Sequence, residues 1–247
     1  MIRRALIIYC DDTESGELPG PSKDNSNLRN YLTSLIGGEW EPSEIKSLRN
    51  PTIDQVKSAV NNFLNTADYT FTVFSGHGWI NTNENNTQYL EVGDGDISIY
   101  DLETKADRQT IIIDSCRGYI SPLNESLSKG LGRAVESFSS RSSSTRQLFD
   151  NIVMRAEEGI SVLFSASENQ SSSDSEKGGA YIYSLLAVSR NWFKNDKTSN
   201  IFTVKNAHQS GILFMKDNFN TKQKPVMMPE KRMRYFPLSV KFTPVKF

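Results

Sequence analysis

The chain has 247 residues, and its 28 basic and 29 acidic residues leave a formal net charge of −1. This length can form one large α/β domain with a sizeable core, and we favour a single domain over 1–247 rather than two small ones. The sequence has no basic stripe of the kind that nucleic-acid-binding proteins carry, and no apolar run of the roughly 20 residues that span a bilayer. Residues 1–4 lead straight into a short apolar run, so we expect a soluble, cytoplasmic protein with neither nucleic-acid nor membrane partners.

The first half of the chain alternates apolar runs of strand length with helical patterns, as βαβ units do. Strands are predicted at Ala5–Tyr9, Glu44–Leu48, Tyr69–Phe74 and Thr110–Ile113. Helices are predicted at Ser26–Ile36 and after the capping box Thr52–Gln55. A hairpin is predicted between Tyr89–Val92 and Ile97–Tyr100, turned by residues 93–96.

The second half opens with a serine-rich stretch, Ser121–Thr145, which is predicted to be a mobile loop. The elements predicted after it are a capping box at Ser144–Gln147 with its helix, a strand at Ile160–Ser165, helices at Ala180–Phe193 and Phe202–Phe219, and a last strand at Tyr235–Phe242 that closes the sheet. Together these elements predict an α/β fold, with a mostly parallel central sheet flanked by helices.

A histidine and a cysteine follow two of the predicted strands. His77 lies in Ser75-Gly76-His77-Gly78, just after Tyr69–Phe74, and Cys116 follows Thr110–Ile113. In an open α/β sheet, ligands bind beyond the carboxyl ends of the strands, so we expect these two side chains to be neighbours. The sequence therefore predicts a Cys/His hydrolase.

The residue types around this pair suit nucleophilic catalysis. Cys116 would be the nucleophile, activated as a thiolate, and His77 the general acid and base. Glycines beside His77 let a substrate backbone approach closely and leave amide groups free. The N–H groups of Gly78 and Cys116 are therefore candidate oxyanion donors.

The other histidine and cysteine serve as internal comparisons. His208 shares a helical face with Val204, Ile212 and Met215, so we expect a packed histidine there. Cys10 ends the first strand without glycine flanks and is assigned to packing or to the pocket wall. These four residues show no paired ligand spacing, so zinc is not expected.

Asp114 precedes Cys116 by two residues, which in an extended chain puts the two side chains on the same face. A carboxylate beside a nucleophilic thiol opposes thiolate formation, so another task is expected for it. We favour recognition of a cationic substrate side chain, because such a contact is charge-assisted and specific. A structural Asp that caps a nearby turn is the alternative.

These motifs resemble those of the caspase and metacaspase family of cysteine peptidases, which carry a Ser-Gly-His-Gly stretch and a cysteine motif like Asp114-Ser115-Cys116. The likeness extends to Ala5–Tyr9 and to Ser165–Ser172 followed by Gly178-Gly179-Ala180, where Ser167 replaces a common cysteine. The resemblance implies a caspase-like three-layer sandwich and peptide-bond hydrolysis through a Cys116 thioester, without an organic cofactor. The Asp at position 114 is metacaspase-like and implies cleavage after Arg or Lys.

The resemblance also assigns further residues. Asp114 would form the base of the primary specificity pocket, helped by Asp11 or Asp12 and by Ser165 or Gln170. It divides the chain into a large-subunit-like part over about 1–125 and a small-subunit-like part over about 145–247, joined by the loop over about 121–145. Self-cleavage at the arginines in or beside this loop is possible; these are Arg133, Arg141 and Arg146.

Many metacaspases require calcium, and Asp94 and Asp96 supply suitable oxygen ligands in a comparable region. Ordinary hairpin-turn chemistry is the favoured explanation of these two residues, so no metal is expected and calcium is kept as an alternative.

The expected partner is a protein or peptide substrate, and the family leaves room for a neighbouring cell-death or defence effector. The rival hypothesis is a catalytically silent caspase homologue that binds a partner through the same groove. A serine hydrolase is not expected, because the chain has no Gly-x-Ser-x-Gly motif.

Overall fold

A six-stranded sheet forms the centre of the computed structural model, which describes residues 1–119 and 144–241. Its strand order is β13-β11-β9-β5-β1-β4. The five parallel strands are β1 (Arg3–Tyr9), β4 (Ile45–Arg49), β5 (Tyr69–Ser75), β9 (Arg108–Asp114) and β11 (Gly159–Phe164). The sixth, β13 (Val226–Met228), pairs antiparallel with β11. The predicted mostly parallel sheet is therefore confirmed.

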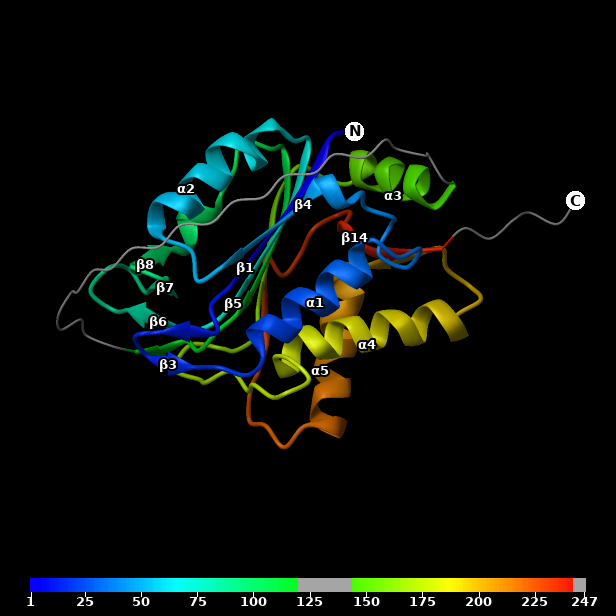
Figure 1. The fold of residues 1–247 in the computed structure, drawn as a ribbon. Coiled ribbons are helices and arrows are strands. Elements are labelled where there is room, and N and C mark those ends of the chain that lie inside the picture. The colour runs from blue at the N-terminus through cyan, green and yellow to red at the C-terminus, as the bar shows by residue number, and fades with distance from the viewer. Residues whose placement is uncertain (120–143, 242–247) are drawn as a thin grey trace, which may run out of the picture.

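Helices cover both faces of this sheet (Figure 1). One face carries α2 (Ile53–Asn62), and the other carries α1 (Pro21–Leu32), α4 (Ala180–Asn195) and α5 (Val204–Asn218). Helix α3 (Ser144–Arg155) packs against β14 (Pro237–Val240), and its residues Phe149 and Val153 join the core on the α1 and α4 side of the sheet. The predicted three-layer α/β sandwich is thus confirmed.

Each face of the sheet has its own hydrophobic core, which explains the continuous apolar runs of the central strands. In β1, Leu6 and Ile8 face the α2 side, whereas Ala5 and Ile7 face the side of α1 and α4. Because successive strand residues point to opposite faces, a strand buried on both faces has no polar alternation.

Local sequence signals set several helix ends. The predicted capping box at Thr52 is present: its hydroxyl accepts from the Gln55 N–H, and the Gln55 side chain accepts from the Thr52 N–H. The predicted helix Ser26–Ile36 is shifted, because α1 begins at Pro21, whose fixed φ suits a first helical turn. It ends at Leu32, after which the chain turns through Gly38 in a left-handed conformation.

The predicted closing strand at Tyr235–Phe242 is wrong in its partner. Strand β14 (Pro237–Val240) pairs with β12 (Ile201–Thr203) in a separate two-stranded sheet. The sheet edge is instead occupied by β13, which the sequence analysis did not identify. A strand of three residues is too short to show a periodic pattern, and its pairing depends on long-range contacts.

A second, four-stranded sheet lies at the carboxyl ends of the central strands, close to the small hairpin of β2 (Asp12–Thr13) and β3 (Gly16–Glu17) (Figure 1). Its order is β10-β6-β7-β8, with bounds Gly118–Tyr119, Gly78–Asn81, Thr87–Val92 and Gly95–Ser98. The predicted hairpin is formed by β7 and β8, although Ile99–Leu102 is a 3-10 helix rather than the end of the strand.

The predicted loop over 121–145 lies outside the described residues up to position 143, and so do Arg133 and Arg141. Ser144 and Thr145 form the start of α3. Within residues 1–119 and 144–241, no helix is long and apolar enough to cross a membrane.

Candidate active site

The register of the central sheet brings the two motifs together. Strands β5 and β9 pair in parallel, with Ser75 opposite Asp114. His77 and Cys116 therefore each lie two residues beyond aligned positions on neighbouring strands. The expected proximity of the two motifs follows from this pairing.

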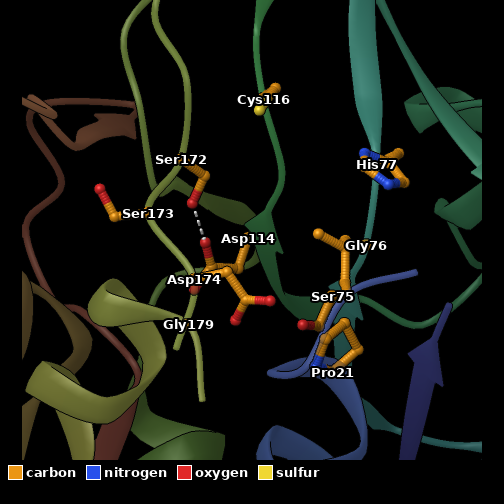
Figure 2. Close-up of a pocket in the computed structure, with 11 residues that line it drawn as sticks. Pro21, Ser75, Gly76, His77, Asp114, Cys116, Ser172, Ser173, Asp174 and Gly179 are labelled. Carbon is orange, nitrogen blue, oxygen red and sulfur yellow. Dashed lines mark hydrogen bonds between the residues drawn. The ribbon is translucent and has the colours of Figure 1, made fainter. Parts of the chain in front are cut away.

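A pocket opens between these two strand ends, with about 370 Å³ of empty space that includes its open mouth. Cys116 and His77 lie on two sides of the pocket, and the buried Asp114 lies between them and Gly179 (Figure 2). The lining residues come from the β3–α1 connection, the start of α1, the two strand ends and the segment before α4: Leu18, Pro21, Ser75, Gly76, His77, Asp114, Cys116, Ser172, Ser173, Asp174 and Gly179. This lining includes two carboxylates and no lysine or arginine.

Asp114 lies in the depth of the pocket with only 4% of its surface exposed. Its carboxylate accepts from the Ser172 hydroxyl at 2.5 Å and from the Ile182 N–H at 3.2 Å. Ile182 lies in the first turn of α4, so the helix N-terminus faces this carboxylate and favours its charge. Burial nevertheless raises the pKa of Asp114 above its ordinary value.

Two more carboxylates gather beside Asp114. Asp24 of α1 is fully buried and accepts from the Ser75 hydroxyl at 2.7 Å and from the Gly179 N–H at 3.0 Å. Burial, reinforced by the charge of Asp114, raises the pKa of Asp24 well above its usual range. Asp174 lines the pocket and accepts from the Gly20 N–H at 2.9 Å, and burial raises its pKa as well.

Close packing against these carboxylates explains the Gly178-Gly179 pair. A Cβ on Gly179 would lie 2.3 Å from Asp114 Oδ2 and 3.2 Å from Asp24 Oδ2. Gly178 has a φ of +111°, and a Cβ there would lie 2.3 Å from Asp24 Oδ1. Only glycine allows the backbone to pass between two carboxylates at this distance.

The imidazole of His77 is oriented by the β2–β3 hairpin. His77 Nε2 lies 3.3 Å from the carbonyl oxygen of Gly16. A carbonyl can only accept, so this contact requires the proton on Nε2. The other ring nitrogen, Nδ1, is then the one available for proton exchange.

The segment that carries Cys116 is held in place by hydrogen bonds that involve Gln88 and Arg117. The Gln88 amide donates to the Cys116 carbonyl at 3.1 Å, and Arg117 Nε donates to Gln88 Oε1 at 3.0 Å. The Arg117 guanidinium also stacks on Phe164 at 4.1 Å. Such contacts fix the backbone from which the thiol projects.

The remaining predicted pocket residues lie elsewhere. Asp11 forms an ion pair with Arg49 at 3.0 Å, and hydrogen bonds and the Arg49 charge lower its pKa despite the opposing effect of partial burial. Asp12 is exposed in β2, and neither residue lines the pocket.

Gln170 and Ser165 support the pocket wall from behind. The Gln170 side chain accepts from the Lys224 N–H at 3.0 Å. The buried Ser165 hydroxyl lies 3.1 Å from that of Ser172, which in turn donates to Asp114. Ser165 is thus one hydrogen bond removed from the pocket carboxylate.

The second histidine and the second cysteine are packed, as expected. His208 Nδ1 lies 2.6 Å from the buried Tyr181 hydroxyl, and burial lowers the pKa of His208 to about 4. Cys10 is fully buried in the core on the α2 side, where burial raises its pKa. Neither lines the pocket.

The β7–β8 turn, where calcium was kept as an alternative, is engaged in packing. Asp94 Oδ1 accepts from the Ile53 N–H at 2.7 Å, which fastens the hairpin to the start of α2. Across the described parts of the chain, no three His, Cys, Asp or Glu side chains gather as a metal site would need. The expectation of no metal stays a prediction, with calcium at Asp94 and Asp96 as its alternative.

Sequence reasoning missed Asp24, Asp174 and Gln88. A signal for Asp24 exists, because it precedes Leu28 by four residues and Tyr31 by seven, which places it on the buried stripe of α1. A signal for Gln88 exists too, because it precedes Leu90 and Val92 by two and four residues, which places it on the buried face of β7. Asp174 comes from a segment without regular secondary structure, and only the folded chain brings it to the site.

Comparison with known proteins agrees with this geometry. The family model described as the caspase domain matches residues 2–236. A crystal structure of caspase-1 from Spodoptera frugiperda superposes with a TM-score of 0.64 at 13% identity, covering 97% of this chain and 92% of that one. No curated protein matches the sequence. The chain therefore belongs to the caspase-domain family, whose members are cysteine peptidases acting on protein substrates.

Proposed function

We propose that this protein is a cysteine endopeptidase that cleaves peptide bonds after arginine or lysine, with Cys116 as the nucleophile and His77 as the general acid and base. The observation that carries the preference is the pocket lining, which has Asp114 and Asp174 but no basic side chain, and has Asp24 directly behind it. A carboxylate side chain of a substrate would be repelled there. A guanidinium or ammonium group would offset the cost of burying these charges.

The chemistry follows from the positions of the two side chains at the mouth. The Cys116 thiol first gives its proton to Nδ1 of His77, and the thiolate attacks the carbonyl carbon of the substrate to form a C–S bond. His77 then delivers that proton from Nδ1 to the leaving nitrogen as the C–N bond breaks, which leaves a thioester. Water attacks the thioester and gives up a proton to Nδ1, the C–S bond breaks to release the acid, and the Cys116 sulfur takes the proton back from His77.

Backbone amides would stabilise the oxyanion of both steps. The Glu91 N–H donates to the His77 carbonyl at 3.1 Å, so His77 is a hydrogen-bonded position in the β6–β7 ladder. Such positions alternate along an antiparallel pair, which turns the Gly78 N–H away from β7 and toward the side of β10 and Cys116. The Gly78 and Cys116 N–H groups are therefore the donors we assign.

Fluorogenic peptides test the proposal. Purified protein is incubated with substrates that differ only in Arg, Lys, Leu or Asp at P1, the residue before the scissile bond, in parallel with Cys116→Ala. We expect turnover of the Arg and Lys substrates that the alanine variant abolishes. A preference for Asp would refute the role of Asp114, and equal turnover by Cys116→Ala would refute the mechanism.

Thiol labelling separates this proposal from a catalytically silent module. An activated Cys116 should react with an iodoacetamide probe near neutral pH, whereas the fully buried Cys10 should not. Absence of both labelling and turnover would favour the silent module.

A further inference from the structure

The four-stranded sheet presents two aromatic rings on the same face as the histidine of the site. Trp79 follows His77 by two residues, so both side chains lie on the same side of the strand. Tyr89 of β7 is paired with Trp79, and the rings stack with centroids 4.9 Å apart and planes 16° apart. The two rings therefore form a flat extension of the face that carries the imidazole.

The core does not account for this aromatic pair. Residues on the opposite face of the same sheet, Ile80, Leu90 and Ile97, are at most 1% exposed, and Leu90 and Ile97 belong to the core on the α2 side. Trp79 and Tyr89 are both half-buried and keep part of their rings in solvent. A stacked aromatic pair at the rim of a pocket is suited to contact a ligand side chain.

The electrostatic surroundings of the pair favour a cation. The segment from Gly78 to Glu103 contains no lysine or arginine and six acidic residues: Glu84, Glu91, Asp94, Asp96, Asp101 and Glu103. Glu91 is paired with Asp96 next to the stack, and Glu84 accepts from the Tyr89 hydroxyl. In the described parts of the chain, no ion pair neutralises Glu84, Glu91 or Asp96.

The direction of the substrate links this surface to the reaction. A general acid must reach the leaving nitrogen, so the residues after the scissile bond depart on the His77 side of the pocket. Trp79 lies two strand positions beyond His77, a distance of about 6.6 Å, and an extended peptide advances by about 3.3 Å per residue. The second residue after the scissile bond, P2′, then lies over the Trp79 ring.

We infer that Trp79 and Tyr89, surrounded by Glu84, Glu91 and Asp96, form a subsite that selects a basic side chain, above all arginine, at P2′ of the substrate. The inference rests on the proposed peptidase function and adds a second basic requirement on the leaving side. A planar guanidinium can stack on the indole while the carboxylates neutralise its charge.

Internally quenched peptides with arginine at P1 and Arg, Ala, Tyr or Asp at P2′ test the inference. We expect kcat/KM to be about 10-fold higher for Arg than for Asp at P2′, with the difference shrinking at high salt, because exposed charges are screened. Trp79→Ala should reduce this preference about 3- to 10-fold. Glu91→Gln, which retains an oxygen for the Ser15 N–H, should reduce it in a protein that folds normally.

Tyr100→Ala is the matched control, because Tyr100 is 65% exposed in the neighbouring 3-10 helix and is not part of the stack. A short fluorogenic substrate, in which the dye is joined by an amide bond to arginine at P1 and no P2′ residue is present, tests the peptidase function separately from the P2′ subsite. Failure of the wild type to cleave this dye would refute the peptidase function and the subsite with it. Normal cleavage of the dye without a P2′ preference, with a preference for Tyr, or with an Arg preference that survives both variants would overturn the subsite alone.

Discussion

Replacement of Asp24 by asparagine should change substrate cleavage and protein stability in opposite directions. Asparagine retains an oxygen for the Gly179 N–H and a polar group toward the Ser75 hydroxyl, so the geometry of the pocket wall is preserved. What disappears is one of the buried charges behind the pocket. The substitution therefore isolates electrostatics from packing.

The magnitude for catalysis is bounded by the energy of a direct charge-assisted contact, because Asp24 lies behind the pocket lining and not in it. A direct contact contributes about 1.5–3 kcal/mol, so we expect the loss of the Asp24 charge to lower kcat/KM for an arginine substrate by at most about 10-fold. A substrate with leucine at P1 gains nothing from Asp24, so its slow cleavage should change by less than about 2-fold.

The stability of the free protein should rise. The folded-state pKa of Asp24 is raised by burial and by Asp114, so ionisation of this carboxyl near neutral pH opposes folding. Protonation of Asp24 therefore contributes to the free energy of unfolding in full below the ordinary pKa of a carboxyl, and this contribution is lost as pH rises through the raised folded-state pKa. Asparagine does not ionise, so Asp24→Asn avoids this loss of stability, and we expect a higher Tm at pH 7.5 than for the wild type.

Steady-state kinetics with arginine and leucine substrates, together with thermal unfolding, measure both effects. Asp12→Asn is the control, because it also removes one negative charge nearby but from an exposed side chain outside the pocket. An unchanged Arg-to-Leu ratio in Asp24→Asn would refute the reasoning that the pocket reads positive charge. A lowered ratio in Asp12→Asn would restore that residue as a pocket helper.

The remaining predictions concern pH, packing and the N-terminal core. Burial raises the pKa values of the pocket carboxylates, so kcat/KM for arginine substrates should fall with decreasing pH well before ordinary carboxyls protonate, and a flat profile down to pH 5 would contradict this. Gly179→Ala should abolish cleavage, because its Cβ would meet Asp114 Oδ2, whereas Gly118→Ala, with open space around it, should cleave and unfold like the wild type. Arg3→Met should lower the free energy of unfolding, measured with urea, by about 3–5 kcal/mol, because the fully buried Arg3 pairs with Glu44 and Asp150. A decrease of less than about 1 kcal/mol would show that these ion pairs are dispensable.

The elements of the fold were predictable where the signal is local. Apolar runs with no alternation indicated β1, β5 and β9 because each of these strands is buried on both faces. The capping box at Thr52 indicated the start of α2 for the same kind of reason, since its hydrogen bonds join residues three positions apart.

The sequence by itself also indicated the proposed reacting pair, because His77 and Cys116 each follow a strand whose end is evident from its neighbours. The proposed specificity pocket was different. Asp114 could be suspected from its spacing to Cys116, but Asp24 and Asp174 reach it from positions 90 residues before and 60 residues after it in the chain. No local pattern encodes such a distance, and only the packing of α1 and α4 against the sheet brings three carboxylates to one place. The partner of β14 and the position of β13 were decided in the same way, by long-range pairing rather than by the residues of either strand.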